Sequence, residues 1–98
     1  MPQLLVNVPT PGSPVRAIAQ QTSAQYLLVI ACKGIGGPTL APNTGKVRVG
    51  FSSATNSQPM ELAPGAVQQY FVALGLLDLS NFYVDAVTAG DGAVFQWV

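Results

Sequence analysis

Short apolar segments, separated by polar and turn-forming residues, run along the whole chain. In segment 46–51 apolar and polar positions alternate, so Val47, Val49 and Phe51 share one face and the two charged residues lie on the other. Segment 26–32 is apolar throughout, which is typical of a central strand covered on both faces. Both patterns predict β-strands.

Three further segments favour strands. Segments 67–72 and 82–88 are rich in aromatic and β-branched residues. Segment 93–98 follows Gly90-Asp91-Gly92, a turn signal that predicts a hairpin between 82–88 and 93–98. Weaker strand candidates are 4–8, 15–20 and 59–62.

Ten glycines and eight prolines set the boundaries between these segments. Segment 9–14 cannot form a helix or a central strand, because proline lacks the backbone N–H and has a fixed φ. Segment 34–45 is predicted to be a loop, and Ala63-Pro64-Gly65 suits a tight turn. One helical turn is predicted, around 66–69.

Strands of this length and spacing predict an all-β fold. We expect a single antiparallel β-sandwich over residues 1–98, jelly-roll-like, with about eight short strands. Residues 1–14 are a candidate extended N-terminal arm. Such an arm either forms an edge strand on its own sheet or adds to the sheet of a neighbour, and the sequence leaves both alternatives open.

Charged residues are scarce, and this limits the function. They make up 8% of the chain, none of the residues is histidine, and 49% are hydrophobic, whereas a typical soluble domain is about 25% charged. Apolar surface of this kind is usually contact surface. The net charge is zero, so no field attracts phosphate and no nucleic-acid binding is predicted. The longest apolar run has seven residues, against about 20 for a membrane span, and no signal peptide is predicted.

Few side chains offer catalytic chemistry. Without histidine the serines have no conventional base to activate them. Asp78, Asp85 and Asp91 could act as a glycosidase pair only in a cleft, which so small a sandwich rarely has. Asp91 is explained by its place in a turn between two glycines. Asp78 is predicted to accept hydrogen bonds in a turn or helix cap. Asp85 is predicted to pair with Lys46 or Arg48 across a sheet. We predict no catalytic residue.

No cofactor and no metal site is predicted either. The run Gly34-Ile35-Gly36-Gly37 is followed by Pro38 instead of a helix, so it indicates a mobile glycine loop and not a phosphate loop. Cys32 is the only cysteine, which excludes an internal disulfide and a thiolate zinc site. We interpret Cys32 as a small buried hydrophobe.

The C-terminal segments are apolar on both faces, which favours a protein interface over a hairpin covered by loops. One face of 93–98 is expected to fill the core and the other to bind a partner. The N-terminal arm adds apolar residues that little would hold on a small domain. The candidate interface residues are Leu4, Leu5, Val6, Tyr83, Val87, Val94, Phe95, Trp97 and Val98.

The order of parts after Val47 carries a resemblance. The strand Val47-Arg48-Val49-Gly50, the segment from Pro59 to Gly65, the segment from Asp78 to Ala86 and the turn beginning at Gly90 follow one another. This order resembles the small β-sandwich virion proteins of tailed bacteriophages, which are head decoration (cement) or tail accessory subunits. The resemblance covers about half of the chain and carries no catalytic residue. It implies a homotrimer that clamps neighbouring capsid subunits, on a virion assembled in the host cytoplasm.

The sequence therefore predicts a non-enzymatic structural virion protein, first of all a capsid decoration protein. Its partners would be copies of itself and the major capsid protein or another virion protein. A tail or head-tail accessory protein is the nearest alternative. A carbohydrate-binding module, with Trp97, Tyr70 or Tyr83 as a stacking platform, is a further one. A small enzyme is disfavoured by the missing histidine and the few carboxylates.

Overall fold

A computed structural model describes residues 3–34, 41–51, 58, 60–71 and 77–98, with only the backbone described for 41–42, 68–71 and 77. Within these ranges the chain forms twelve strands, eight of them three or more residues long, and one 3₁₀ turn, η1. The strands are β1 (Gln3–Asn7), β2 (Val15–Arg16), β3 (Ser23–Ala24), β4 (Tyr26–Ile30), β5 (Cys32–Gly34), β6 (Ala41–Pro42), β7 (Val47–Gly50), β8 (Met60–Leu62), β9 (Val67–Phe71), β10 (Leu77–Asp78), β11 (Tyr83–Ala86) and β12 (Gly92–Trp97), and η1 spans Leu79–Asn81.

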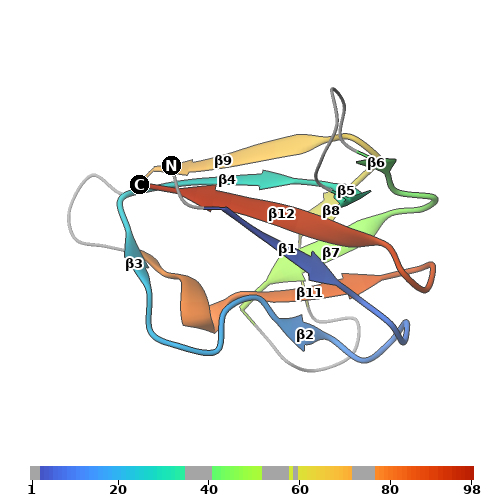
Figure 1. The fold of residues 1–98 in the computed structure, drawn as a ribbon, viewed down its shortest axis with the longest axis horizontal. Coiled ribbons are helices and arrows are strands. Elements are labelled where there is room, and N and C mark those ends of the chain that lie inside the picture. Colours follow the sequence, from blue (N-terminus) through green and yellow to red (C-terminus); the bar gives the residue numbers. More distant parts are fainter. Residues whose placement is uncertain (1–2, 35–40, 52–57, 59, 72–76) are drawn as a thin grey trace.

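Two four-stranded antiparallel sheets make up most of the structure. Sheet A has the strand order β1-β12-β4-β9, and sheet B has the order β2-β11-β7-β8 (Figure 1). Two small sheets, β10-β3 and β5-β6, flank them. The predicted all-β antiparallel sandwich is confirmed, whereas the strand order does not show jelly-roll connectivity.

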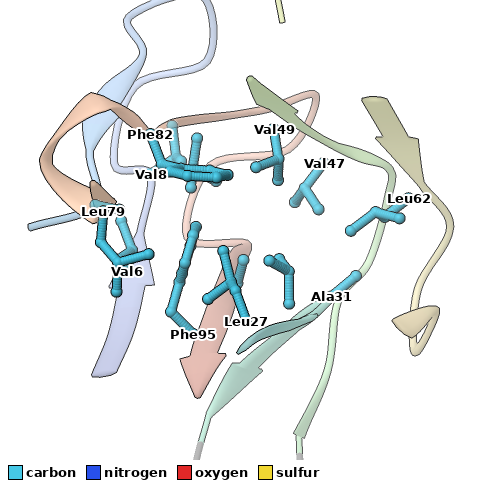
Figure 2. Packing of buried hydrophobic residues seen from close by; sticks show 14 of the residues in the cluster. Val6, Val8, Leu27, Ala31, Val47, Val49, Leu62, Leu79, Phe82 and Phe95 are labelled. Atoms are coloured by element: carbon cyan, nitrogen blue, oxygen red, sulfur yellow. The ribbon is translucent and has the colours of Figure 1, made fainter. Parts of the chain in front are cut away.

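The hydrophobic core lies between sheets A and B, where the inward-facing residues of both sheets meet (Figure 2). Alternation along the strands explains which residues face inward: in β4, Leu27 and Val29 are fully buried and their neighbours only partly. Val47 and Val49 of β7, which the sequence placed on one face, are fully buried in the same way. Phe82 joins the layers, and its ring packs edge-on against that of Phe95 with 6.0 Å between centroids.

The predicted hairpin between 82–88 and 93–98 is wrong. β11 pairs with β7 and β2 in sheet B, whereas β12 pairs with β1 and β4 in sheet A. Backbone hydrogen bonds at the crossover explain why: Gly90 N–H donates to the Val8 carbonyl, and Val8 N–H donates to the Asp91 carbonyl, at 2.9 Å each. These bonds bring the chain to β1, where a side chain at Gly92 would overlap the Val6 carbonyl oxygen. The turn after Gly90 therefore connects two sheets.

Two other sequence predictions need correction. Phe51 follows β7 but is 60% exposed, because the strand ends at Gly50 and the alternation ends with it. The ring of Phe51 still packs edge-on against Phe82, with 4.8 Å between centroids. No helical turn forms around 66–69, because β9 begins at Val67. The one helical turn of the described residues is η1, which begins after Asp78.

The N-terminal arm forms an edge strand on its own sheet. β1 pairs with β12 over its whole length, from Gln3 opposite Gln96 to Asn7 opposite Gly92. Of the two alternatives that the sequence left open, the structure shows pairing with the chain's own sheet and not with the sheet of a neighbour. The beginning of β1 and the end of β12 therefore lie at the same end of sheet A, where Figure 1 also places the C-terminus.

Candidate functional site

The carboxylate of Asp91 is a hydrogen-bond acceptor for backbone N–H groups. The residue is fully buried, and its carboxylate accepts hydrogen bonds from the N–H groups of Thr44 (2.9 Å) and Gly45 (2.7 Å). The neighbouring Asn43 bonds both the N–H and the carbonyl of Gly92, so the loop before β7 is tied to the crossover before β12. The explanation of Asp91 by its own turn was too narrow, since its carboxylate binds a loop distant in the sequence.

Asp78 is the acceptor that the sequence predicted. Its carboxylate caps η1 by accepting from the Ser80 N–H at 3.0 Å and from the Ser80 hydroxyl at 2.7 Å. The N–H of Thr22 also points to this carboxylate, at 3.4 Å. These hydrogen bonds, first of all those from Ser80, hold the pKa of Asp78 below its ordinary value.

Asp85 lies on the outer face of sheet B, opposite Arg48 in the register, yet its side chain is almost fully buried. One carboxylate oxygen, Oδ1, accepts from Gly12 N–H (3.0 Å) and from Ala86 N–H (2.8 Å). The other oxygen, Oδ2, is buried without a hydrogen-bond partner in the described part of the chain. The ion pairs predicted for Asp85 are not seen among the described residues, because Arg48 pairs with Glu61 (3.5 Å) instead.

The three aspartates therefore do not gather into a site. Each binds backbone N–H groups in a different part of the fold, and no pocket opens over the residues that the structure describes. Within the same residues, no three His, Cys, Asp or Glu side chains come together to hold a metal ion. Cys32 is buried, and burial raises the pKa of its thiol. Of the glycine loop, only Gly34 lies within the described residues.

The nine candidate interface residues fall into two groups. Val6, Val94 and Phe95 are buried within the chain itself, so they are not available to a partner. Val6 and Phe95 face the core between the sheets, and Val94 is covered on the outer face of sheet A, between Leu5 and Ile30 in the register. This part of the predicted interface is corrected: these three apolar side chains are buried by the fold of the chain itself.

The other six candidates reach the surface to different degrees. Val98 (68% exposed), Val87 (55%) and Leu4 (38%) are exposed, and Leu5 is half-buried. Trp97 is also half-buried, since it packs against the core. Tyr83 lies beneath the Arg16 guanidinium, which donates to its hydroxyl at 2.7 Å.

The aromatic residues that suggested a carbohydrate platform do not form one among the described side chains. Trp97 lies in sheet A and Tyr83 in sheet B, and the side chain of Tyr70 lies outside the described residues. Two aromatic ring pairs of the described residues, Phe51–Phe82 and Phe82–Phe95, are edge-on, and both include the buried core residue Phe82.

The sequence analysis named only part of the outer face of sheet A, since Leu5 and Val94 were candidates and Ile30 and Val67 were not. Four residues lie side by side across its four strands: Leu5 opposite Val94, Val94 opposite Ile30, and Ile30 opposite Val67. This set is the apolar row. Val67 is 52% exposed, Leu5 and Ile30 are half-buried, and no strand of sheet A contains a charged residue. The signal was present in the two-sided apolar character of 26–32, but a row across strands depends on the register.

The outer face of sheet B is different in character. Glu61 of β8 lies between two cations, with Lys46 Nζ at 3.6 Å from Oε2 and Arg48 Nε at 3.5 Å from Oε1. These groups are at least partly exposed, so water screens the pairs and each contributes little stability. This face is typical of a solvated sheet surface.

The comparisons with known proteins give no relative. No protein-family model, no curated protein and no solved structure matches the chain. Among the described residues, no helix has the length and apolar character to cross a membrane. The functional argument therefore depends on the residues and their geometry.

Proposed function

We propose that this protein is a non-enzymatic structural subunit of a virion, with capsid decoration as its role. The observation that supports this proposal best is the distribution of polar chemistry. The aspartates are occupied by backbone N–H groups, while apolar side chains remain exposed. A small sandwich of this kind works by contact and not by reaction. The order of segments from Val47 to the turn beginning at Gly90 resembles that of small phage virion proteins. This resemblance is the reason for proposing a virion as the binding partner.

One end of sheet A suits attachment to a particle. Leu4 near the beginning of β1 and Val98 after the end of β12 are both exposed there, and Trp97 is half-buried beside them. Apolar and aromatic residues with few charges are typical of the core of a protein interface. Bound across the joints between capsid subunits, this end would add binding free energy that stabilises the assembled shell.

The test compares particles that lack this protein with complete particles. We expect complete particles to survive higher temperature and stronger osmotic shock. Attachment should persist as salt rises from about 0.1 to about 1 M, although the Debye length falls from about 10 Å to about 3 Å, because the contact is apolar. Equal resistance of both particles would refute a decorating role, and detection of the protein only in tails would make it a tail accessory protein.

Variants make the same test specific. Val98→Lys or Leu4→Lys should reduce the number of copies bound per particle. Val87→Lys is the matched control, since Val87 is also an exposed apolar residue, with an exposure between those of Leu4 and Val98, but follows β11 of sheet B. If Val87→Lys alone prevents attachment, the docking end is on the other sheet.

A further inference from the structure

We infer that the linkage between Asp91 and Gly92 is a modification site, which turns into isoaspartate in the unfolded chain and is kept unreactive in the folded chain by Asn43. This inference goes beyond the proposed role in a virion, because it concerns the chemical lifetime of the chain itself. It rests on the sequence Asp-Gly and on the hydrogen bonds that hold both residues where the chain crosses from sheet B to sheet A.

The sequence supplies the reacting pair of groups. The backbone nitrogen after an aspartate can attack the carboxyl carbon of that side chain. One carboxyl oxygen then leaves as water, with the amide hydrogen and a proton from solvent, and a five-membered succinimide ring remains. A following glycine allows this attack best, because it has no Cβ to crowd the nitrogen or restrict the backbone. Asp91 is the only aspartate that precedes a glycine, since Asp78 precedes a leucine and Asp85 an alanine.

Water completes the reaction by opening the ring at one of its two carbonyl groups. Opening at the former side-chain carbonyl restores aspartate. Opening at the main-chain carbonyl gives isoaspartate, in which the chain runs through the side-chain carbons and is one backbone atom longer. The water that left is replaced by the water that enters, so the mass of the chain is unchanged and no electrons are exchanged.

In the folded chain both reacting groups are already bound. The N–H of Gly92 donates to Asn43 Oδ1 at 3.0 Å. Each carboxylate oxygen of Asp91 accepts one backbone N–H, from Thr44 at 2.9 Å and from Gly45 at 2.7 Å. The attack would remove the hydrogen from the nitrogen and one oxygen from the carboxylate, so a bond on each side would be lost. Because Asp91 is fully buried, no water would replace these bonds.

The backbone on both sides of the linkage is held as well. The carbonyl of Asp91 accepts from Val8 N–H, and Gly90 N–H donates to the Val8 carbonyl, at 2.9 Å each. Asn43 Nδ2 donates to the carbonyl of Gly92 at 2.8 Å. The peptide group is therefore bound to the end of β1 and to Asn43, while the carboxylate is bound to the loop before β7. The nitrogen and the carboxyl carbon cannot approach to bonding distance without breaking some of these contacts.

Asn43 is the positioning residue of this arrangement. Its amide has one acceptor and one donor group, and it uses both on Gly92. The side chain is buried, and the next two residues bind the carboxylate of Asp91. Asn43→Ala would release the nitrogen that attacks, yet leave the sequence Asp-Gly and the carboxylate unchanged.

The fold has little space for the product. Gly92 begins β12 opposite Asn7, and a side chain at Gly92 would overlap the Val6 carbonyl oxygen. An extra backbone atom before β12 would displace either the carboxylate from its loop or β12 from its register with β1. A chain that isomerises while unfolded should therefore not regain the parent fold, so the reaction would permanently mark chains that fail to fold.

The experiment incubates the full chain at neutral pH, folded or in guanidinium above the unfolding transition. A protease that cleaves before aspartate but not before isoaspartate then digests the samples. An uncleaved 85–98 peptide measures isoaspartate at position 91, and cleavage before Asp78 and Asp85 is the internal reference. The variants are Asn43→Ala and, as its control, Asp78→Ala, which removes the cap of η1 but no contact of Gly92. Circular dichroism and melting temperature are measured for each.

We expect isomerisation at Asp91 to be at least about a hundredfold slower in the folded parent than in guanidinium, because it proceeds from the open fraction of molecules. Folded Asn43→Ala should isomerise at least about tenfold faster than the folded parent, since a lost buried hydrogen bond raises the open fraction by about this factor. Asp78→Ala should stay close to the parent. In guanidinium all three chains should react at the same rate, because Asn43 acts only through the fold. If Asn43→Ala does not fold, Asn43→Ser replaces it, since its hydroxyl can bond only one of the two Gly92 groups.

Four results would overturn the inference. In the first, the unfolded chain isomerises no faster at Asp91 than at Asp78 and Asp85. In the second, the folded parent isomerises nearly as fast as the unfolded chain. The third is a folded Asn43 variant that reacts no faster than the parent or than Asp78→Ala, and the fourth is a purified isoaspartate chain that refolds with the melting temperature of the parent. None of these results bears on the particle test, so the two proposals can fail separately.

Discussion

The two sheets of the sandwich share one core but differ on their outer faces. In sheet B every strand carries one charged residue: Arg16 in β2, Asp85 in β11, Arg48 in β7 and Glu61 in β8. In sheet A no strand carries any. With so few charges in the chain, the charged residues of the two large sheets are all found in sheet B, and the outer face of sheet A is apolar and amide-bearing.

The edges of the sheets repeat this contrast. An exposed edge strand offers unpaired backbone groups to other chains, and charged residues on the edge discourage such pairing. The edge strands of sheet B, β2 and β8, carry Arg16 and Glu61, whereas the edge strands of sheet A, β1 and β9, carry no charge. In the part of the chain that the structure describes, the edge strands of sheet A therefore lack the charged residues that discourage pairing.

The chain itself also covers the two outer faces differently. On sheet B the N–H of Gly12 binds Asp85, so the proline-rich loop before β2 lies against this face and buries a carboxylate. On sheet A, Leu5, Ile30 and Val67 stay partly exposed. The described part of the chain therefore covers a carboxylate on sheet B and leaves part of the apolar row of sheet A exposed to water.

The largest effect should come from the core that both sheets share. Phe95→Ala removes a fully buried ring from sheet A, and we expect a loss of about 3–5 kcal/mol in the free energy of unfolding. Phe51→Ala, beyond the end of β7 in sheet B, removes a ring that is mostly exposed and should cost less than about 1 kcal/mol. Urea denaturation of both variants measures the difference. Equal losses would show that Phe51 is a core residue in solution.

An intermediate effect is expected where the loop covers sheet B. Asp85→Ala removes the acceptor for the N–H groups of Gly12 and Ala86 and should lower the free energy of unfolding by about 1–3 kcal/mol. Asp85→Asn keeps the Oδ1 acceptor, so its loss should be smaller. Hydrogen exchange at Gly12 gives a local readout. If exchange at Gly12 is the same in Asp85→Ala and the parent, this carboxylate does not hold the loop.

The smallest effect should come from the charges on the outer face of sheet B. Glu61→Gln removes the carboxylate that pairs with Lys46 and Arg48, and we expect a change of less than about 1 kcal/mol in the free energy of unfolding, because the pairs are solvent-screened. The change should vanish at about 1 M salt, where the Debye length is about 3 Å. A salt-independent loss larger than that would mean that this face is not simply solvated.

Much of the local structure could be predicted from the sequence. Alternation placed Val47 and Val49 on one face of a strand, which the structure shows to be the core face, and the apolar run containing Leu27 and Val29 marked a central strand. Asp78 was identified as a cap from its place before a short polar turn. These features depend on the period of a strand or on neighbouring residues, so a single segment contains the necessary information.

Strand partners could not be predicted in this way. Gly90-Asp91-Gly92 has the composition of a hairpin turn, but the partner of β12 is β1, more than eighty positions away in the sequence. Asp91 was explained by its own turn, although its carboxylate binds Thr44 and Gly45. The pairing of the N-terminal arm with its own sheet was likewise left open by the sequence. These outcomes follow from contacts between distant segments, which local patterns do not contain.

By itself, the sequence determined the class of the fold, the apolar face of segment 46–51 and a composition with very few charges. Only the tertiary structure decided where those charges lie and which apolar residues remain accessible. Val94 and Phe95 were candidates for a partner but are buried in this chain, whereas Val67 and Ile30 were overlooked and lie in the apolar row. The physical reason is that hydrophobic residues favour burial equally in a core or in an interface, and only the strand order and register separate the two.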